Sequence, residues 1–426
     1  MGGNATEHLR GRDDANIRVC RSIDGGALMG DWMDRVVAAE RLRSSFSAQF
    51  QWDTVRVTPD KIAGRTVADA VVVPTEVPNH PFATMDGYAL DTADSSPRPI
   101  AGSVETADDP EPLADGTAVE VATGASLPEG ADAVVPVEEA TVENGCLIES
   151  TTAPGRNLYP AGATAAQGER IFDPGDQLAP RHAALLRDVG IDQISVRSRP
   201  AVGILATGTE IARGDQPDRD SAMLANLLRR WGTEPTILEP VSDDQSHVTA
   251  AIERATAEYD LLITSGGTSV GAGDHVGSVL AEHGPLFTSV ALRPGRPTTA
   301  AVVDGTPVCA LPGKPVAAHT AATLVLRPAL AAQTAVAEDP AVTVRATSDV
   351  ELPAQDAEYA VPVALCDGRA VPTGQGDDTG DLYGSRFRPG RVASSTRVTL
   401  ADGIIVTTDS IAAGELVQVT PFEVIE

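Results

Sequence analysis

Lysine, aromatic residues and closely spaced cysteines are scarce in this 426-residue sequence. Its only lysines are Lys61 and Lys314, so 30 of its 32 basic side chains are arginines, and aromatic residues make up 4% of the chain. A core with so few aromatic rings must consist mostly of Ala, Val, Leu and Ile. The wide cysteine spacing excludes a CxxC zinc site and predicts free thiols in a reducing cytoplasm at Cys20, Cys146, Cys309 and Cys366.

Positive charge and long apolar runs are lacking as well. The chain has 60 acidic against 32 basic residues, which gives a net charge of −28. Such a charge repels nucleic acid and anionic membranes, so we expect neither as a partner. No stretch of about 18 apolar residues occurs, which excludes a membrane-spanning helix. A surplus of acid with almost no lysine is typical of proteins adapted to high salt, because concentrated ions screen the repulsion between carboxylates.

The sequence does contain enough apolar material for several domains. Apolar residues account for 42% of the chain, and a chain of this length corresponds to about two to four domains. Residues 1–30 are polar and glycine-rich, which predicts a flexible extension. A helix is expected from Asp31 to about Phe46, and short valine-rich pieces up to about residue 150 predict strands.

Between residues 201 and 338, buried apolar runs alternate with amphipathic helices. This alternation predicts a doubly wound, mostly parallel sheet, in which ligands bind at the carboxyl ends of the strands. The expected strands are 201–206, 235–241, 260–264, 308–311 and a piece near 289–292, and the expected helices are 221–231, 244–258, 275–283 and one starting at Pro315. The chain after about residue 340 predicts a small β-barrel or sandwich, with strands at 343–346, 359–365, 397–400, 404–407 and 416–419.

Two glycine-containing loops follow strands of the predicted sheet. In the loop at 206–210, Gly208 lets the backbone approach a ligand and Glu210 suits a polar group or a metal, although an ordinary turn with a solvated carboxylate explains the same residues. The loop at 264–275 has four glycines and four hydroxyl residues and opens a helix. Its N–H groups suit a phosphate, with helix capping as the alternative. An acidic Asp274 fits beside phosphate only if Mg²⁺ bridges them.

Two stiff turns carry cations at strand ends. Residues 293–297 read RPGRP and residues 311–315 read LPGKP, so each turn holds a basic side chain next to proline. A guanidinium group chelates a tetrahedral oxyanion with two donors, whereas solvated surface turns would need no ligand. Together with the glycine loops, an oxyanion site explains these turns better than unrelated surface loops do.

Six motifs follow one another along the chain. They are MDGYA at 85–89, TGASLPEGADAVV at 123–135, TGTE at 207–210, SGGTSVGAGD at 265–274, PGRP at 294–297 and LPGKP at 311–315. As a set they resemble the molybdopterin molybdenumtransferases, the family that includes the gephyrin E domain, from about residue 31 to the C-terminus. The resemblance implies insertion of molybdate, or tungstate, into adenylylated molybdopterin, with release of AMP and assistance by Mg²⁺.

The same resemblance implies an elongated homodimer with four domains per subunit. It divides the chain into a discontinuous elongated domain at 31–69 and 153–198, a β-rich lobe at 70–152, a molybdopterin-binding α/β domain at 199–338 and a C-terminal β-barrel domain at 339–426. The lobe of one subunit would face the α/β domain of the other across the active-site cleft.

Roles for particular residues are implied in the same way. The catalytic candidates, of which the two arginines would receive molybdate, are Asp86, Asp274, Arg293 and Arg296. Carboxylates that would hold Mg²⁺ are Glu210, Asp243, Asp244 and Asp274. Residues that would bind the pterin and its phosphates are Thr123, Thr207, Gly208, Ser265, Gly266, Gly267, Thr268, Ser269, Gly313 and Lys314.

Several positions depart from the family's pattern. Arginine replaces lysine at 293 and 296, and the NPVS that follows LPG in the family is here KPVA, at Lys314 to Ala317. Ala163 and Thr164 stand where the family has two carboxylates, and Val361 stands for an arginine. These losses leave open a non-catalytic paralogue that binds or delivers the pterin, although Lys314 adds anion affinity. A nucleotide hydrolase of the competence-damage type is a third hypothesis, against which the flanking β domains argue.

Overall fold

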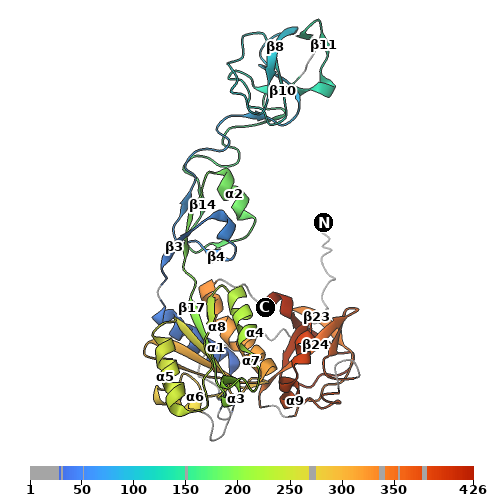
Figure 1. Ribbon diagram of the computed structural model, residues 1–426. Helices are drawn as coiled ribbons and strands as arrows, with labels where there is room; N and C mark the ends of the chain where they lie inside the picture. The colour runs from blue at the N-terminus through green and yellow to red at the C-terminus, as the bar shows by residue number, and fades with distance from the viewer. Residues whose placement is uncertain are drawn as a thin grey trace, which may run out of the picture.

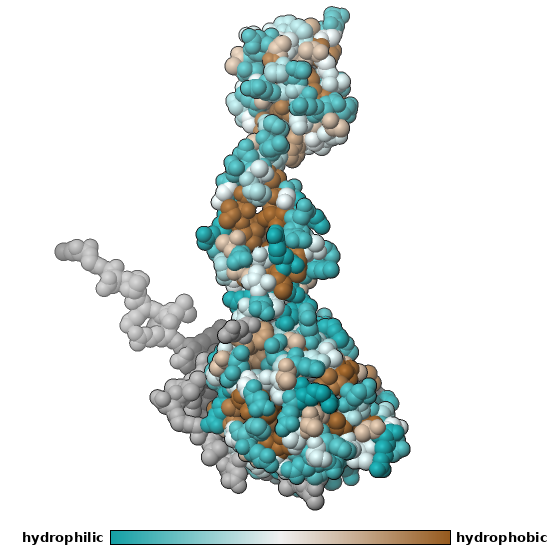
Figure 2. All heavy atoms as spheres, turned by 60° about the vertical axis from the view of Figure 1, so that its left-hand side comes forward, coloured by the Kyte–Doolittle hydropathy of each residue, from teal (hydrophilic) through white to brown (hydrophobic). Residues whose placement is uncertain are grey.

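The protein is elongated, with three parts that follow one another along its long axis (Figure 1 and Figure 2). An α/β domain and a small β domain lie side by side at one end, a narrow neck follows, and a β lobe forms the other end. The computed structural model describes residues 28–29, 32–50, 52–148, 152–267, 275–334, 341–353, 356–376 and 381–426. The predicted extension 1–30 lies outside these residues except for Leu28–Met29 (β1), which pairs with Trp32–Met33 (β2).

The α/β domain is built on a five-stranded sheet in the order β18-β17-β19-β22-β21. The first four strands run parallel, and β21 pairs antiparallel with β22 at the edge. The predicted doubly wound, mostly parallel sheet is therefore confirmed, with an edge strand that the sequence pattern did not reveal. The bounds are β17 Ala201–Ala206, β18 Glu234–Ile237, β19 Leu261–Ser265, β21 Thr299–Val303 and β22 Thr306–Leu311.

Helices cover both faces of this sheet. On one face, α5 (Gln245–Thr256) and α6 (His275–Glu282) pack against Leu205 and Leu262. On the other face, α4 (Ser221–Arg230) packs against Ile204 and Ile263. The predicted helix from Pro315 covers the second face as one continuous rod, which consists of α7 (Pro315–Ala321), a π-helical turn η3 (Ala322–Leu326) and α8 (Arg327–Thr334). Neighbouring residues of one strand thus point to opposite helical layers.

The N-terminal helix α1 (Arg35–Gln49) belongs to the packing of this domain. Asp34 caps the helix, because its carboxylate accepts hydrogen bonds from the N–H groups of Val36 and Val37 at 2.8 and 3.1 Å. Buried side chains on one face of α1, among them Leu42 and Phe46, join the core that α4 and α8 share. The helix expected at 31–46 is therefore present, and this part of the proposed 31–69 segment packs on the α/β domain. The other domain limits remain predictions.

The neck is a ribbon in which an outgoing stretch of chain pairs with a returning one. Four successive antiparallel pairs join them, and α2 (His182–Asp188) packs alongside η1 (Pro59–Lys61). The pairs are β3 (Thr54–Val57) with β16 (Ile194–Arg197), β4 (Arg65–Thr66) with β15 (Gln177–Leu178), β5 (Val71–Val72) with β14 (Arg170–Phe172), and β6 (Phe82–Ala83) with β13 (Leu158–Tyr159). This pairing explains how a narrow column of chain supports a lobe at its tip.

The lobe contains a six-stranded sheet in the order β10-β7-β9-β8-β12-β11. Short apolar residues such as Ala89 and Val134 fill its core, as the valine-rich sequence predicts. The strands are β7 (Gly87–Leu90), β8 (Arg98–Val104), β9 (Ala118–Val121), β10 (Ala133–Pro136), β11 (Val142–Glu143) and β12 (Cys146–Leu147).

The C-terminal domain confirms the predicted β-barrel. Strands follow the order β24-β25-β23-β27-β26, and β26 pairs with β24 to close the ring. The strand predicted at 397–400 is wrong: Thr396–Leu400 forms a 3₁₀ helix, where the Thr399 hydroxyl donates to the Thr396 carbonyl at 2.6 Å. Such local bonds compete with strand pairing. The barrel strands are β23 (Val342–Ala346), β24 (Glu358–Cys366), β25 (Arg369–Pro372), β26 (Gly403–Thr407) and β27 (Leu416–Pro421).

One short strand connects this barrel to the α/β domain. The piece expected near 289–292 forms β20 (Leu292–Arg293), which pairs in parallel with the start of β24. Among the described residues, no helix has the length and apolar character needed to cross a membrane. The described cysteines, Cys146, Cys309 and Cys366, are free thiols as predicted.

Candidate functional site

Loops from three parallel strands meet at the carboxyl edge of the sheet. The N–H of Thr207, after β17, donates to the carbonyl of Ser265 at 2.9 Å, and the N–H of Gly266, after β19, donates to the carbonyl of Leu311 at 3.3 Å. The loops that the sequence singled out are therefore neighbours in space. This is the edge at which open α/β sheets bind their ligands.

Glycine is required where these loops touch. Gly266 has φ +91°, and a Cβ there would lie 2.6 Å from the Thr207 carbonyl oxygen. A Cβ on Gly313 would lie 2.9 Å from the Gly266 Cα. Any larger residue would force the loops apart, so the glycines let the backbones come into direct contact.

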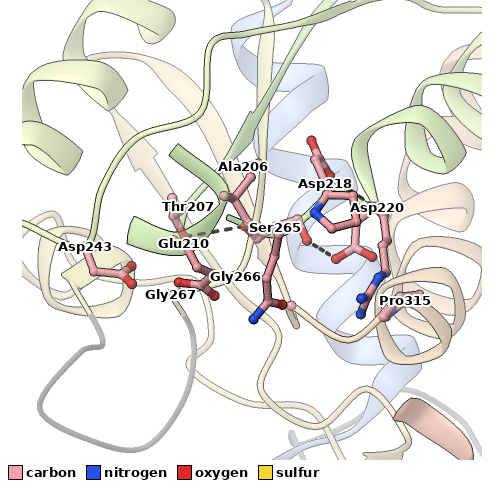
Figure 3. Close-up of a pocket in the computed structure, with 16 residues that line it drawn as sticks. Ala206, Thr207, Glu210, Asp218, Asp220, Asp243, Ser265, Gly266, Gly267 and Pro315 are labelled. Atoms are coloured by element: carbon pink, nitrogen blue, oxygen red, sulfur yellow. Dashed lines mark hydrogen bonds between the residues drawn. The ribbon is translucent and has the colours of Figure 1, made fainter. Parts of the chain in front are cut away.

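An acidic pocket of about 440 Å³ opens beside these glycines (Figure 3). Its carboxylates come from Glu210, Asp218, Asp220 and Asp243, and Arg219 is its cation. Predicted residues that line it are Thr207, Gly208, Glu210, Asp243, Ser265, Gly266, Gly267 and Gly313. Figure 3 places Glu210 and Asp243 on one side of Ser265 and the pair Asp218 and Asp220 on the other.

Asp220 is the most unusual carboxylate in this pocket. The residue is 6% exposed, and its Oδ2 accepts a hydrogen bond from the Ser265 hydroxyl at 2.5 Å. Its Oδ1 is buried and accepts no hydrogen bond from any residue that the structure describes. Burial raises the pKa of Asp220, and the neighbouring Asp218 raises it further, against the hydrogen bond from Ser265. An unpartnered buried oxygen is costly for the fold, which is typical of a group kept for a ligand.

A basic pocket of about 560 Å³ adjoins the acidic pocket and shares Gly266, Gly267 and Gly313 with it. Its cations are Arg293, Arg296 and Lys314. The positive charges of these side chains are only weakly paired within the protein. Arg293 is 3.6 Å from the Asp356 carboxylate, and Lys314 donates to the Gly390 carbonyl at 3.5 Å. Within the described part of the chain, Arg296 has no ion pair. The two stiff turns therefore present three cations to one cavity.

The remaining metal and phosphate candidates are placed differently. Asp244 caps α5, because its Oδ1 accepts hydrogen bonds from the N–H groups of Ser246 and His247 at 3.0 and 3.2 Å. A hydrogen bond from the Ser246 hydroxyl, together with these two, lowers the pKa of Asp244. It does not line either pocket, so helix capping accounts for this residue. Thr268, Ser269 and Asp274 lie outside the described residues.

Asp86 directly precedes β7 and Thr123 follows β9, so both lie in the distal lobe (Figure 1) and not at this edge of the α/β sheet. Both the N–H and the hydroxyl of Thr123 donate to Asp86 Oδ1, at 2.6 and 2.7 Å, and these bonds lower the pKa of Asp86. Asp86 therefore carries a negative charge at neutral pH. Within one subunit, the neck separates this pair from the two pockets.

The positions that depart from the family's pattern fall into two groups. Arg293, Arg296 and Lys314 line the basic pocket, whereas Ala163, Thr164 and Val361 lie away from it. Ala317 lines the basic pocket, whereas Val361 is fully buried in the barrel core and lines neither pocket. Ala163 and Thr164 lie near the join of neck and lobe, where the Thr164 hydroxyl is 3.2 Å from that of Tyr159. Position 361 here serves the packing of the barrel.

Sequence reasoning missed Asp218, Arg219 and Asp220. They directly precede α4, and Asp218 Oδ1 accepts from the N–H groups of Asp220 and Ser221, each at 3.0 Å. Three charged residues before a helix are easily interpreted as ordinary capping. The available signal was their position opposite the loops after β17 and β19, which only the sheet order reveals.

Known proteins match both halves of this architecture. A family model described as MoeA N-terminal region (domain I and II) matches residues 37–190, and one described as probable molybdopterin binding domain matches residues 203–332. Residues outside these ranges include the whole C-terminal barrel. The two matched ranges contain both pockets' glycine loops and the distal lobe.

Individual relatives agree with the family models. A molybdopterin molybdenumtransferase 2 of Mycobacterium tuberculosis is 31% identical over 292 residues, which are 63% of this chain and 72% of that protein. A molybdopterin molybdenumtransferase of Haemophilus influenzae is 30% identical over 313 residues, covering 70% and 77%. The crystal structure of a molybdopterin biosynthesis MoeA protein from Pyrococcus horikoshii superposes with a TM-score of 0.73 at 28% identity, covering 92% of this chain and 99% of that one. The chain therefore belongs to the molybdopterin molybdenumtransferase family, whose enzymes act in the biosynthesis of the molybdenum cofactor.

Proposed function

We propose that this protein inserts molybdenum from molybdate into adenylylated molybdopterin and releases AMP, with the reaction taking place where the acidic and basic pockets meet. One observation carries this proposal: two cavities of opposite charge adjoin along Gly266, Gly267 and Gly313. Molybdate is a dianion and needs cations around it, whereas the N–H donors of the pterin ring need acceptors. The two substrates would therefore react at the boundary between the basic and the acidic pocket.

The basic pocket suits the oxyanion. Molybdate is a tetrahedral dianion, and the guanidinium groups of Arg293 and Arg296 offer paired N–H donors while Lys314 adds a third positive charge. Tungstate has the same charge and shape, so both oxyanions are candidate substrates. Replacement of lysine by arginine at 293 and 296 preserves the charge that binding requires.

The acidic pocket suits the pterin ring, and with Mg²⁺ between carboxylates and phosphates it suits the phosphates as well. The unpartnered Oδ1 of Asp220 is an acceptor for an N–H donor of the bound ring. Gly267 lines both pockets, and its N–H would bind a phosphate oxygen. Ser265, through its hydroxyl, holds Asp220 in the orientation that this contact needs.

Magnesium fits this pocket only together with the substrate. Among the described residues no group of three or more acidic, histidine or cysteine side chains is arranged to hold a metal. Glu210 and Asp243 do line the same cavity, and Mg²⁺ usually takes one or two carboxylates and completes its shell with phosphates and water. When bound there, the ion would neutralise charge on the phosphate oxygens.

The distal lobe supports a homodimeric enzyme. Asp86 and Thr123 match the family's motifs but lie at the far end of the subunit from the pockets. They are able to reach substrate only in a site that two subunits build together, with the lobe of one facing the α/β domain of the other. We also propose a cytoplasmic location and adaptation to high salt, in line with the net charge of −28.

The test is turnover of adenylylated molybdopterin by the purified protein in concentrated potassium chloride with Mg²⁺. Molybdate should release AMP and yield molybdenum-loaded cofactor, and tungstate in a parallel reaction decides between the two oxyanions. Glu210→Gln should reduce turnover to background, since it removes one of the two carboxylates that we propose for Mg²⁺. Tight pterin binding without AMP release would favour the delivery paralogue, which the named relatives do not favour.

A further inference from the structure

Trp32 lies against both arginines of the basic pocket. The guanidinium carbons of Arg293 and Arg296 are 4.8 and 5.0 Å from the centre of the Trp32 ring. Both distances are within the range of about 6 Å at which a cation is attracted to an aromatic face, and tryptophan is the most effective ring for this contact. The two guanidinium carbons consequently lie within about 10 Å of each other.

The backbone holds Trp32 in register with the arginine turn. Met33, the next residue, donates from its N–H to the Ser289 carbonyl at 3.0 Å and accepts at its carbonyl from the N–H of Ala291 at 2.7 Å. Two residues later this same segment reaches Arg293. On the other side, Asp34 begins α1, whose apolar face is buried in the core of the α/β domain. The ring and the turn are thus fixed to one another from both directions.

Two neighbouring cations need such a support. Arg293 and Arg296 repel each other when no anion lies between them. If nothing held them, these flexible side chains would turn away from each other into water. Attraction to the indole offsets this repulsion before any ligand arrives. Arg293 also lies 6.0 Å from the buried ring of Tyr359, whereas Arg296 depends on Trp32 for its aromatic contact.

Arginine, rather than lysine, makes this support possible. A guanidinium group is planar and weakly hydrated, so it stacks on an aromatic ring and still directs N–H donors outward. An ammonium group is compact and strongly hydrated, and it stacks less well. The change from lysine to arginine at 293 and 296 is thereby matched by a tryptophan at 32.

We propose that Trp32 is a positioning residue that holds Arg293 and Arg296 ready for the oxyanion. This inference rests on the proposed function, in which these arginines receive molybdate. It assigns a role to the segment before α1, which none of the motifs contains. Trp32 itself lines neither pocket and acts through the arginines.

The experiment compares Trp32→Leu, Trp32→Phe and Trp52→Leu. Trp52 is the matched control, because Arg197 lies 5.7 Å from its ring in the neck, away from the pockets. Molybdate binding to each protein is measured by isothermal titration calorimetry, which does not depend on a tryptophan signal, and kcat and KM are measured separately. Trp32→Leu should weaken molybdate binding and raise its KM by roughly 5- to 30-fold with a smaller change in kcat, since two cation–π contacts are lost. Trp32→Phe should recover part of the loss, and Trp52→Leu should bind molybdate normally.

A double-mutant cycle separates positioning from simple damage. Arg296→Lys should weaken binding in the natural background but add little once Trp32 is leucine, because the contact that lysine fails to make is already gone. Fully additive losses would overturn the proposal, as would normal molybdate affinity in Trp32→Leu. If Arg296→Ala also binds molybdate normally, the oxyanion site of the proposed function fails. If Arg296→Ala binds poorly while Trp32→Leu binds normally, only the role of Trp32 fails. Trp32→Phe gives the same comparison if the leucine variant does not fold.

Discussion

Gly313→Ala tests whether the direct contact between loops sets the geometry of both pockets. The added methyl group would meet the Gly266 Cα at 2.9 Å and its nitrogen at 3.4 Å. Carbon atoms prefer a separation of about 3.5–4.0 Å, so the loops after β19 and β22 must move apart by roughly 0.5–1 Å. Gly313 has no positive φ, which means that this contact, and not backbone strain, opposes the substitution.

Two consequences of that shift are measurable. Overpacking of this kind costs about 1–3 kcal/mol of unfolding free energy, which thermal or denaturant unfolding detects. A misplacement of about 1 Å at a reacting centre costs on the order of 100-fold in rate, and we expect turnover of Gly313→Ala to fall by 10- to 100-fold, to that order of magnitude. The loss of rate should exceed what the loss of stability explains.

Gly384→Ala provides the control. Gly384 also lacks a positive φ, and a Cβ there would meet nothing within 4 Å. This variant should keep both its stability and its turnover. The reasoning is refuted if Gly313→Ala unfolds and turns over like the natural protein, because the pocket boundary would then tolerate separated loops.

Two further predictions concern the carboxylates. Burial raises the pKa of Asp220 above its ordinary value of 3.8. Asp220 therefore contributes most to the stability of the fold below pH 3.8, and this contribution is lost as the pH rises through the pKa of the folded state. Asp220→Asn should therefore be more stable than the natural protein at neutral pH, while it loses substrate affinity. Unfolding curves of both proteins at acidic and at neutral pH test this. A difference in unfolding free energy between the two proteins that is the same at both pH values would contradict the prediction. Asp86→Asn and Glu210→Gln should each be inactive alone, but a co-refolded mixture of the two should regain about a quarter of the natural activity. Half of the dimers in the mixture contain one subunit of each variant, and one of the two sites in each of these dimers has both residues intact. No recovery would mean that one subunit completes its own site.

Local sequence patterns predicted the elements of the α/β domain well. Apolar runs such as 201–206 and 260–264 became strands within one residue of their expected limits, because buried parallel strands are apolar on both faces. The strand β21 (Thr299–Val303) was missed, since it follows the proline-rich turn of the arginines and resembles its continuation. At 397–400, threonine hydroxyl bonding to the backbone favoured a 3₁₀ turn over the predicted strand.

The sequence predicted only part of the candidate site, because local patterns do not show contacts between distant segments. Motifs that follow strands identified Glu210 and Gly266, because strand ends of a parallel sheet meet at one edge. Arg296 was identified by the basic, proline-flanked turn in which it lies. Asp220 and Trp32 escaped notice, since their importance depends on contacts between segments far apart in the chain: Asp220 with Ser265, and Trp32 with the arginine turn. No local pattern encodes such contacts.

The paired strands of the neck allow the lobe to be removed or exchanged as one unit. Its incoming and outgoing chains run side by side, with Val72 opposite Arg170 in the antiparallel pair nearest the lobe that still packs in the core of the neck. Residues that face each other in such a pair are about 5 Å apart, a gap that a two-residue hairpin turn closes. Evolution, or an engineer, is thus able to remove or exchange the whole lobe at a single place without rerouting the chain beneath it.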